Sequence, residues 1–232
     1  RFPHSTAMKI IKLEETASTN EYCKTLDYDE VVVSSLRQTA GKGTKGRSFQ
    51  SDEGGIYLSY MRRLSGFPAE NAFKIMINSC TAVCRTLELF GIPSSIRWAN
   101  DVLVGGKKIC GTLIENTFSG GYITRSIVGC GINVNNSFSG ELGNIAISMK
   151  EYAGKFFDKE KVEREFISNL KKDYSIDDYK SYMDWLGSVV TLRIQEKEIS
   201  VKAVDVASDG RLIVESDGKL LKISSAEVSL RL

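Results

Sequence analysis

The segment from residue 71 to 90 most constrains the fold, because its apolar residues recur with the helical period of about 3.6 residues. These apolar positions are Phe73, Met76, Ile77, Cys80, Val83, Cys84 and Leu87. Gly91 follows where the C-terminal cap of a helix belongs. A continuous apolar stripe is typical of core packing rather than of ligand binding. We therefore predict a long helix that packs on a sheet.

Short apolar and β-branched runs on both sides of this helix predict the strands of that sheet. They cover residues 8–13, 31–36, 56–61, 96–98, 102–104, 109–115 and 122–132. Ser18 and Glu21 have the spacing of a capping box and predict a helix from residue 18 to about 26. A further amphipathic helix is predicted over residues 158–173. The fold class is therefore α/β of the α+β type, with helices packed on a mixed sheet.

The pattern changes at about residue 186, where short strands begin to follow one another without helices. We predict strands at 189–194, 199–206, 211–215 and 220–224, with tight turns at Asp209-Gly210 and Asp217-Gly218. These strands predict a small β barrel of SH3 size. The expected domains are residues 8–185 and 186–232, and residues 1–7 are interpreted as an expression remnant.

The overall composition excludes two broad classes of protein. The net charge of +2, from 31 basic and 29 acidic residues, does not fit a protein that binds nucleic acid over its whole surface. No apolar stretch approaches the roughly 20 residues of a membrane span. The five cysteines form no Cys-x-x-Cys pair and favour a reducing, cytoplasmic setting. We expect a soluble protein that binds neither DNA nor membrane.

The histidine content narrows the chemistry further. The only histidine, His4, lies in the segment interpreted as an expression remnant. Without it, a serine or cysteine nucleophile has no imidazole base, and the commonest zinc sites have no ligand. Any reaction must therefore use lysine, arginine, carboxylates and backbone amides.

The sequence GKGTKGRSF, residues 41–49, combines three glycines with three cations. It approximates a phosphate-binding P-loop, but Gly54 and Gly55 precede a strand where that motif needs a helix. A glycine-rich basic loop still lets the backbone approach a phosphate or carboxylate closely. Taken alone, it is equally compatible with a solvated surface loop.

Further stretches accompany this loop: RWAND at residues 97–101, GGKKICGTLIE at 105–115 and GCGINV at 129–134. The first mixes charge, amide and aromatic groups in a short turn, and the second carries two lysines into an apolar strand. Asn133 alone is better explained as a hydrogen-bonded core asparagine. Together with STN at 18–20, and in this order, the stretches resemble the motifs of the biotin protein ligases. The resemblance covers nearly all of residues 8–232.

The resemblance implies a catalytic domain like that of class II aminoacyl-tRNA synthetases, followed by an SH3-like domain. It implies activation of biotin with ATP and Mg²⁺ to biotinyl-adenylate, and transfer of biotin to a lysine of a biotin carboxyl carrier domain. No winged-helix segment precedes the catalytic motifs, so we expect a short form without a DNA-binding domain. A homodimer through exposed sheet edges is left open.

The resemblance also assigns site residues. Lys108 and Arg47 are assigned to catalysis, with Lys108 holding the biotin carboxylate and the α-phosphate. The biotin-binding residues are Ser18, Thr19, Asn20, Gln38, Gly41, Lys42, Gly43, Thr44, Lys108 and Gly111. The ATP- or adenylate-binding residues are Arg47, Phe49, Trp98, Asn100, Asp101 and Asn133, and Asp101 is also the candidate ligand of Mg²⁺. Each of two residues also has a simpler interpretation. Lys108 can be a lysine of an edge strand whose ammonium group reaches solvent, and Ser18 can be the cap of a helix.

The chain departs from the family motifs at five positions. Lys42, Phe49, Arg97 and Ala99 roughly preserve the charge or shape of the family residues. Thr44 does not, because it replaces an arginine associated with retention of the adenylate. We hypothesise that Lys45 takes over this task or that the adenylate leaves more readily.

Two other functions fit parts of the pattern. A lipoate or octanoate protein ligase has the same fold and also modifies a carrier lysine, but the basic loop and the terminal β module favour biotin. A module that binds RNA or a protein partner fits the basic loop and the SH3-like segment, and predicts salt-dependent binding without catalysis.

Overall fold

The computed structural model describes residues 8–194, 197–225 and 228–231, so the interpretation of residues 1–7 lies outside the described residues. Its larger part is a seven-stranded mixed sheet with the order β1-β2-β3-β7-β6-β5-β4, in which β1 and β2 are parallel. The strands are β1 (Lys9–Thr16), β2 (Glu30–Gln38), β3 (Ile56–Pro68), β4 (Ser95–Arg97), β5 (Asp101–Val104), β6 (Lys107–Ser119) and β7 (Tyr122–Ile132). The sheet confirms the predicted fold class.

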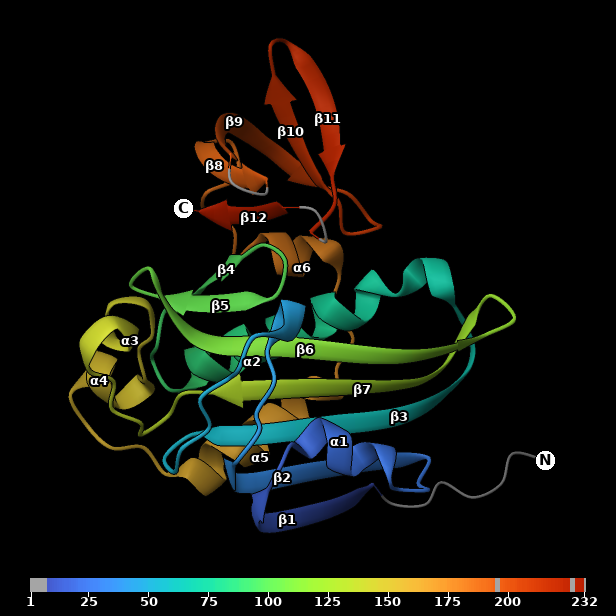
Figure 1. The fold of residues 1–232 in the computed structure, drawn as a ribbon, viewed down its shortest axis with the longest axis vertical. Coiled ribbons are helices and arrows are strands. Elements are labelled where there is room, and N and C mark those ends of the chain that lie inside the picture. Colours follow the sequence, from blue (N-terminus) through green and yellow to red (C-terminus); the bar gives the residue numbers. More distant parts are fainter. Residues whose placement is uncertain (1–7, 195–196, 226–227, 232) are drawn as a thin grey trace.

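Helices cover the two faces of this sheet unequally (Figure 1). The predicted long helix is α2 (Phe73–Leu89), which packs with α5 (Lys159–Leu170) over one face. On the other face lie the short α1 (Thr19–Lys24) and the glycine-rich loop. This second face carries a pocket that residues of β6 and β7 line.

Several short elements were not predicted from the sequence. They are η1 (Thr44–Gly46), η2 (Ala69–Asn71), α3 (Gly140–Ile145), α4 (Met149–Ala153) and α6 (Ile176–Lys180). Ser148 and Ser175 form the capping boxes of α4 and α6. The capping box predicted at Ser18 is wrong: Ser18 is the N-cap residue of α1, but its side chain makes no capping hydrogen bond.

The C-terminal module is an antiparallel sheet with the order β11-β10-β9-β8-β12. Its strands are β8 (Val189–Ile194), β9 (Lys197–Val206), β10 (Leu212–Ser216), β11 (Lys219–Ile223) and β12 (Val228–Arg231). The predicted SH3-like module is confirmed, with a fifth strand, β12, that the sequence did not suggest. Gly210 and Gly218 both have positive φ in the predicted turns, a conformation that glycine adopts readily.

One continuous apolar core joins the C-terminal module to the main sheet. The larger core cluster runs from Val32 and Leu58 of the sheet to Val190 and Leu212 of the terminal module. The Trp98 indole also bridges the two parts, because its Nε1 donates to the Gly210 carbonyl at 2.9 Å. Within the described residues, no helix is long and apolar enough to cross a membrane.

Candidate active site

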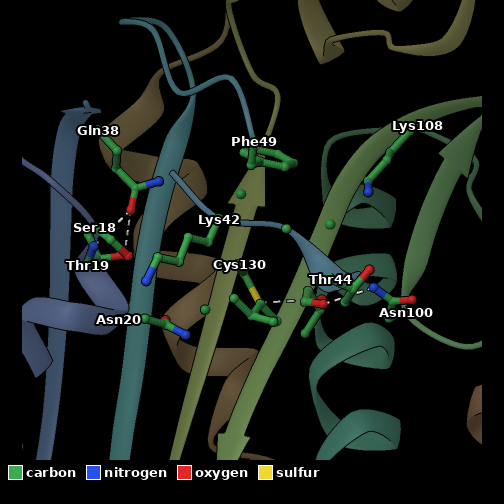
Figure 2. Close-up of a pocket in the computed structure, with 16 residues that line it drawn as sticks. Ser18, Thr19, Asn20, Gln38, Lys42, Thr44, Phe49, Asn100, Lys108 and Cys130 are labelled. Atoms are coloured by element: carbon green, nitrogen blue, oxygen red, sulfur yellow. Dashed lines mark hydrogen bonds between the residues drawn. The ribbon is translucent and has the colours of Figure 1, made fainter. Parts of the chain in front are cut away.

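A pocket lies on the open face of the main sheet, between α1, the glycine-rich loop and strands β6 and β7 (Figure 2). All the predicted biotin-binding residues except Gly41 line it, together with Phe49 and Asn100. The full lining comprises Ser18, Thr19, Asn20, Gln38, Lys42, Gly43, Thr44, Phe49, Asn100, Lys108, Gly111, Thr112, Leu113, Gly129, Cys130 and Gly131. Residues that are far apart in the sequence therefore meet at one site.

The glycine-rich loop folds back on itself over this pocket. The Phe49 amide donates to the Gly41 carbonyl at 2.9 Å, and the Gly43 amide donates to the Arg47 carbonyl at 2.7 Å. Gly41 is buried at the base, where a Cβ atom would lie 2.6 Å from Ser51 Oγ and overlap the Phe49 carbonyl. Gly41 therefore acts by close backbone packing rather than by facing the pocket.

Glycines in β6 and β7 make the floor of the pocket. A Cβ atom on Gly131 would lie 2.6 Å from Cζ of Phe49. A Cβ atom on Gly111 would lie 2.9 Å from Nζ of Lys108. The absence of side chains at these two positions leaves room for the Phe49 ring and the Lys108 ammonium group above the strands (Figure 2).

One end of the pocket carries fixed polar groups from α1 and β2. Gln38 Oε1 accepts hydrogen bonds from the Thr19 amide at 2.8 Å and from Thr19 Oγ1 at 3.1 Å (Figure 2). Ser59 Oγ donates to Thr19 Oγ1 or Asn20 Oδ1, at 2.7 and 2.6 Å. Thr19, Asn20 and Ser59 are all buried. These fixed polar groups suit a ligand that has hydrogen-bond donors and acceptors of its own.

A chain of charges ties the loop to the same end. Lys42 Nζ lies 2.8 Å from Glu21 Oε1, and Lys24 Nζ lies 2.9 Å from the same oxygen. Lys24 also pairs with Glu115 at 2.7 Å, and Glu115 accepts a hydrogen bond from Asn20 at 2.8 Å. Hydrogen bonds from Lys42 and Lys24 lower the pKa of the Glu21 carboxyl below its ordinary value. The pairs hold the loop against α1.

Lys108 projects into the opposite end of the pocket (Figure 2). Its Nζ lies 2.7 Å from Asp101 Oδ1, while Arg97 Nη2 donates to Asp101 Oδ2 at 2.7 Å. Burial alone would raise the pKa of the Asp101 carboxyl, but the charges and hydrogen bonds of Lys108 and Arg97 lower it below its ordinary value. Lys108 Nζ is also 5.8 Å from the centroid of the Phe49 ring. The ammonium group is thus fixed beside the glycine-rich loop and not extended into solvent.

A second cleft adjoins the pocket and reaches the C-terminal module. It contains four of the residues predicted to bind nucleotide. The lining comprises Thr44, Lys45, Arg47, Arg97, Trp98, Ala99, Asn100, Asp101, Arg193, Ser225 and Leu230. Thr44 and Asn100 line both spaces, so the cleft continues the pocket.

Asn133, also predicted to bind nucleotide, lines neither space. Its Nδ2 donates to the Lys108 carbonyl at 3.3 Å and to the Ile147 carbonyl at 3.1 Å. The side chain is buried and supports the backbone that carries Lys108. This arrangement favours the alternative of a hydrogen-bonded core asparagine.

Sequence reasoning missed the contributions of the neighbouring strands. Ser59 and Glu115 fix the polar end, and Thr112 accepts a hydrogen bond from Asn100 Nδ2 through its backbone carbonyl at 3.0 Å. These residues look like ordinary strand positions. Of the lining residues that were missed, only Gly129 and Gly131 could have been recognised from the sequence. Their spacing of two residues places both on one face of β7.

The fold and site together define a two-module α+β protein with a ligand pocket on the open face of its main sheet. Residues 8–133 match the biotin/lipoate A/B protein ligase family, and residues 186–231 match the biotin protein ligase C terminal domain. The chain belongs to the biotin/lipoate A/B protein ligase family. The two matches, in this order, confirm the predicted resemblance to biotin protein ligases.

Individual relatives agree with this assignment. The bifunctional ligase/repressor BirA of Bacillus subtilis is 31% identical over 211 residues, which cover 84% of this chain and 64% of that protein. The chain thus spans somewhat less than two thirds of this relative. The structure of biotin protein ligase from Aquifex aeolicus in complex with biotin and ATP is similar with a TM-score of 0.80 and 31% identity, covering 96% of this chain and 98% of that one.

Proposed function

We propose that the protein is an ATP-dependent biotin protein ligase. The observation that carries the proposal is the position of the Lys108 ammonium group. Asp101 holds this group at the junction of the pocket and the second cleft. In this proposal the pocket binds biotin, with its ureido ring against Thr19, Asn20 and Gln38. The carboxylate end then lies near Lys108, and the nucleotide phosphates occupy the cleft. The complex of the similar Aquifex aeolicus protein with biotin and ATP supports this choice of substrates.

In the first step, a carboxylate oxygen of biotin forms a bond to the α-phosphorus of ATP. The bond between that phosphorus and its bridging oxygen breaks, and pyrophosphate leaves with the electron pair. Negative charge grows on the α-phosphate oxygens as this happens. Lys108 stabilises that charge from a fixed position, so little reorganisation is needed in the transition state.

In the second step, the neutral ε-amine of an acceptor lysine forms a bond to the acyl carbon of biotinyl-adenylate. The bond from that carbon to the phosphate oxygen breaks, AMP leaves, and the amine loses a proton to solvent. Lys108 stabilises the departing phosphate from the same position. Both steps are compatible with a site that uses no histidine, because positioning and charge neutralisation supply the catalysis.

We propose that Mg²⁺ binds only together with the nucleotide phosphates. Each oxygen of Asp101 already lies 2.7 Å from a cationic nitrogen. The geometry therefore does not favour the predicted role of Asp101 as a Mg²⁺ ligand. We assign Asp101 to positioning Lys108 instead.

The proposed acceptor is a lysine of a biotin carboxyl carrier domain, and the proposed compartment is the cytoplasm. Relatives from Paracoccus denitrificans and Mycobacterium tuberculosis are named biotin--[acetyl-CoA-carboxylase] ligase. All five cysteines are buried and free, which suits a reducing compartment.

The test is ATP–pyrophosphate exchange measured with biotin and, in parallel, with lipoate. We expect exchange to depend on biotin and to remain at background with lipoate. Exchange that depends on lipoate but not on biotin would replace the proposal with a lipoate ligase. If neither acid supports exchange while the folded protein binds nucleic acid, the enzyme proposal fails.

A further inference from the structure

The polar end of the pocket contains a chain of hydrogen bonds that begins near the surface and runs inward. Asn20 Nδ2 lies 2.8 Å from Glu115 Oε2, and Ser59 Oγ lies 2.6 Å from Asn20 Oδ1 and 2.7 Å from Thr19 Oγ1. The side chain of Glu115 is 34% exposed, whereas the other three residues are buried. Of the four, Thr19 and Asn20 line the pocket. Glu115 therefore acts on the pocket through other side chains.

The protons of this chain are fixed in one direction. The Glu115 carboxylate accepts hydrogen bonds and donates none, so the amide N–H group of Asn20 faces it and Asn20 Oδ1 faces Ser59. Asn20 Oδ1 also donates none, so the single proton of the Ser59 hydroxyl lies between these two atoms. The distance of 2.7 Å between Ser59 Oγ and Thr19 Oγ1 is that of a hydrogen bond, and the proton in it comes from Thr19. Thr19 Oγ1 is then left as an acceptor.

A second chain of hydrogen bonds orients Gln38 in the same way. Ser51 Oγ donates its one proton to the Phe49 carbonyl at 3.0 Å, so it accepts from Gln38 Nε2 at 2.8 Å. Gln38 Oε1 is thereby turned toward Thr19, whose amide donates to it at 2.8 Å (Figure 2). Gln38 Oε1 and Thr19 Oγ1 are 3.1 Å apart, and both residues line the pocket. The pocket therefore presents two neighbouring acceptors, which suit the N–H donors of a ligand.

Resting on the proposed function, we infer that Glu115 is a positioning residue that determines the specificity of the polar end. Its carboxylate fixes the direction of the chain through Asn20 and Ser59, and this direction makes Thr19 Oγ1 an acceptor for a ligand N–H group. The ureido ring of biotin carries such groups. A ligand that presents an oxygen at the same place leaves its own oxygen and Thr19 Oγ1 without a proton between them. Glu115 thereby favours cyclic ureas without touching them.

The experiment compares the binding of biotin with that of its cyclic carbamate analogues, in which an oxygen replaces one or the other ureido N–H group. The variants, made in the full chain, are Glu115→Gln, Ser59→Ala, the two combined, and Lys24→Gln. A glutamine amide donates as well as accepts, so Glu115→Gln keeps the shape of the side chain and removes the fixed direction. Lys24 Nζ pairs with the other oxygen of Glu115 at 2.7 Å, so Lys24→Gln is the matched control for loss of that ion pair. Calorimetric titration measures the affinities, and thermal unfolding checks that each variant is folded.

We expect wild type to prefer biotin to the more weakly bound analogue about 100-fold, as a buried acceptor left unpaired implies. Glu115→Gln and Ser59→Ala should each reduce this preference to about tenfold or less, because the Thr19 proton is then free to turn toward the ligand. The combined variant should lose no more than either single variant, since both act through one chain. Lys24→Gln should keep the wild-type preference, because an exposed ion pair contributes little.

The inference is overturned if Glu115→Gln keeps the wild-type preference, or if it weakens biotin and the analogues by the same factor, as a purely structural role would. It is also overturned if Lys24→Gln reduces the preference as much as Glu115→Gln does. If Glu115→Gln does not fold, Ser59→Ala decides by the same criterion. A wild-type protein that binds biotin and the analogues equally contradicts the inference, whereas one that neither binds biotin nor shows biotin-dependent exchange overturns the proposed function.

Discussion

At the scale of single residues, the site depends on one carboxylate shared by two cations. Arg97, Asp101 and Lys108 come from the adjacent strands β4, β5 and β6. Asp101 receives both cations at 2.7 Å and is largely buried. Motif resemblance predicted Asp101 and Lys108 as parts of the site, whereas Arg97 was noted only as a departure from a family motif. It did not predict that Asp101 pairs with Lys108, because a sequence does not show which of two nearby groups a carboxylate contacts.

Replacing Asp101 should alter how stability depends on pH. The folded-state pKa of Asp101 is lowered, so its contribution is complete above its ordinary pKa of about 4 and is lost as pH falls through the folded value. Asp101→Asn should therefore cost about 1–3 kcal/mol at pH 7, and the difference from wild type should shrink in acid. Urea unfolding at a series of pH values measures this. A difference that stays constant from neutral pH into acid would contradict it.

Thr44 offers a second test at the scale of residues. It lines both the pocket and the cleft, so an arginine at this position would reach a bound adenylate that threonine does not pair with. We expect Thr44→Arg to slow dissociation of biotinyl-adenylate about tenfold, with Thr44→Ser as the control. The off-rate is measured by displacement with excess biotin. An unchanged or faster off-rate in Thr44→Arg would defeat the hypothesis that Thr44 weakens retention.

At the scale of elements, periodicity predicted the core segments well and their polar extensions poorly. Strand β3 was predicted to end at residue 61 but continues to Pro68, because the polar segment beyond residue 61 pairs with β7. Helices α3, α4 and α6 have only five or six residues, too few to show a helical period. The order of the sheet was also beyond prediction, since β3 pairs with the distant strand β7.

The two glycines at the start of the glycine-rich loop should respond differently to substitution. A Cβ atom on Gly41 would overlap the Phe49 carbonyl, whereas one on Gly43 has its nearest neighbour at 3.5 Å. Gly41→Ala should displace the base of the loop and weaken biotin binding about tenfold or more, while Gly43→Ala should bind nearly as wild type. Calorimetric titration with biotin measures both. Equal affinities for the two variants would rule out close packing at Gly41.

At the scale of the whole molecule, the two modules share a core and a cleft. The sequence predicted a large α+β part and a small β part, because their hydrophobic patterns differ. The contacts between them could not be predicted: Trp98 was expected near the nucleotide, but its indole N–H also donates to Gly210 of the terminal module. Such contacts join segments more than a hundred residues apart, and no local pattern marks them.

Substitutions of two turn glycines test this coupling of the modules. Gly210 and Gly218 both have positive φ, but a Cβ atom on Gly210 would lie 2.5 Å from Cγ of Phe73, and one on Gly218 meets nothing within 4 Å. Gly210→Ala should therefore lower stability by about 1–3 kcal/mol more than Gly218→Ala, since both share the backbone strain and only one disturbs the interface. Thermal unfolding compares them, and equal losses would argue against tight packing of Gly210 on Phe73.

The most direct measurement of the central claim is biotin-dependent ATP–pyrophosphate exchange by Lys108→Ala, with Lys107→Ala as the matched control. Lys107 precedes Lys108 on β6, but its Nζ donates to the Gly143 carbonyl at 2.6 Å and does not line the pocket. If Lys108 stabilises the charge that grows on the α-phosphate, its loss should reduce the exchange rate about 100- to 1000-fold, and Lys107→Ala should retain most activity. Exchange by folded Lys108→Ala at the wild-type rate would contradict the account.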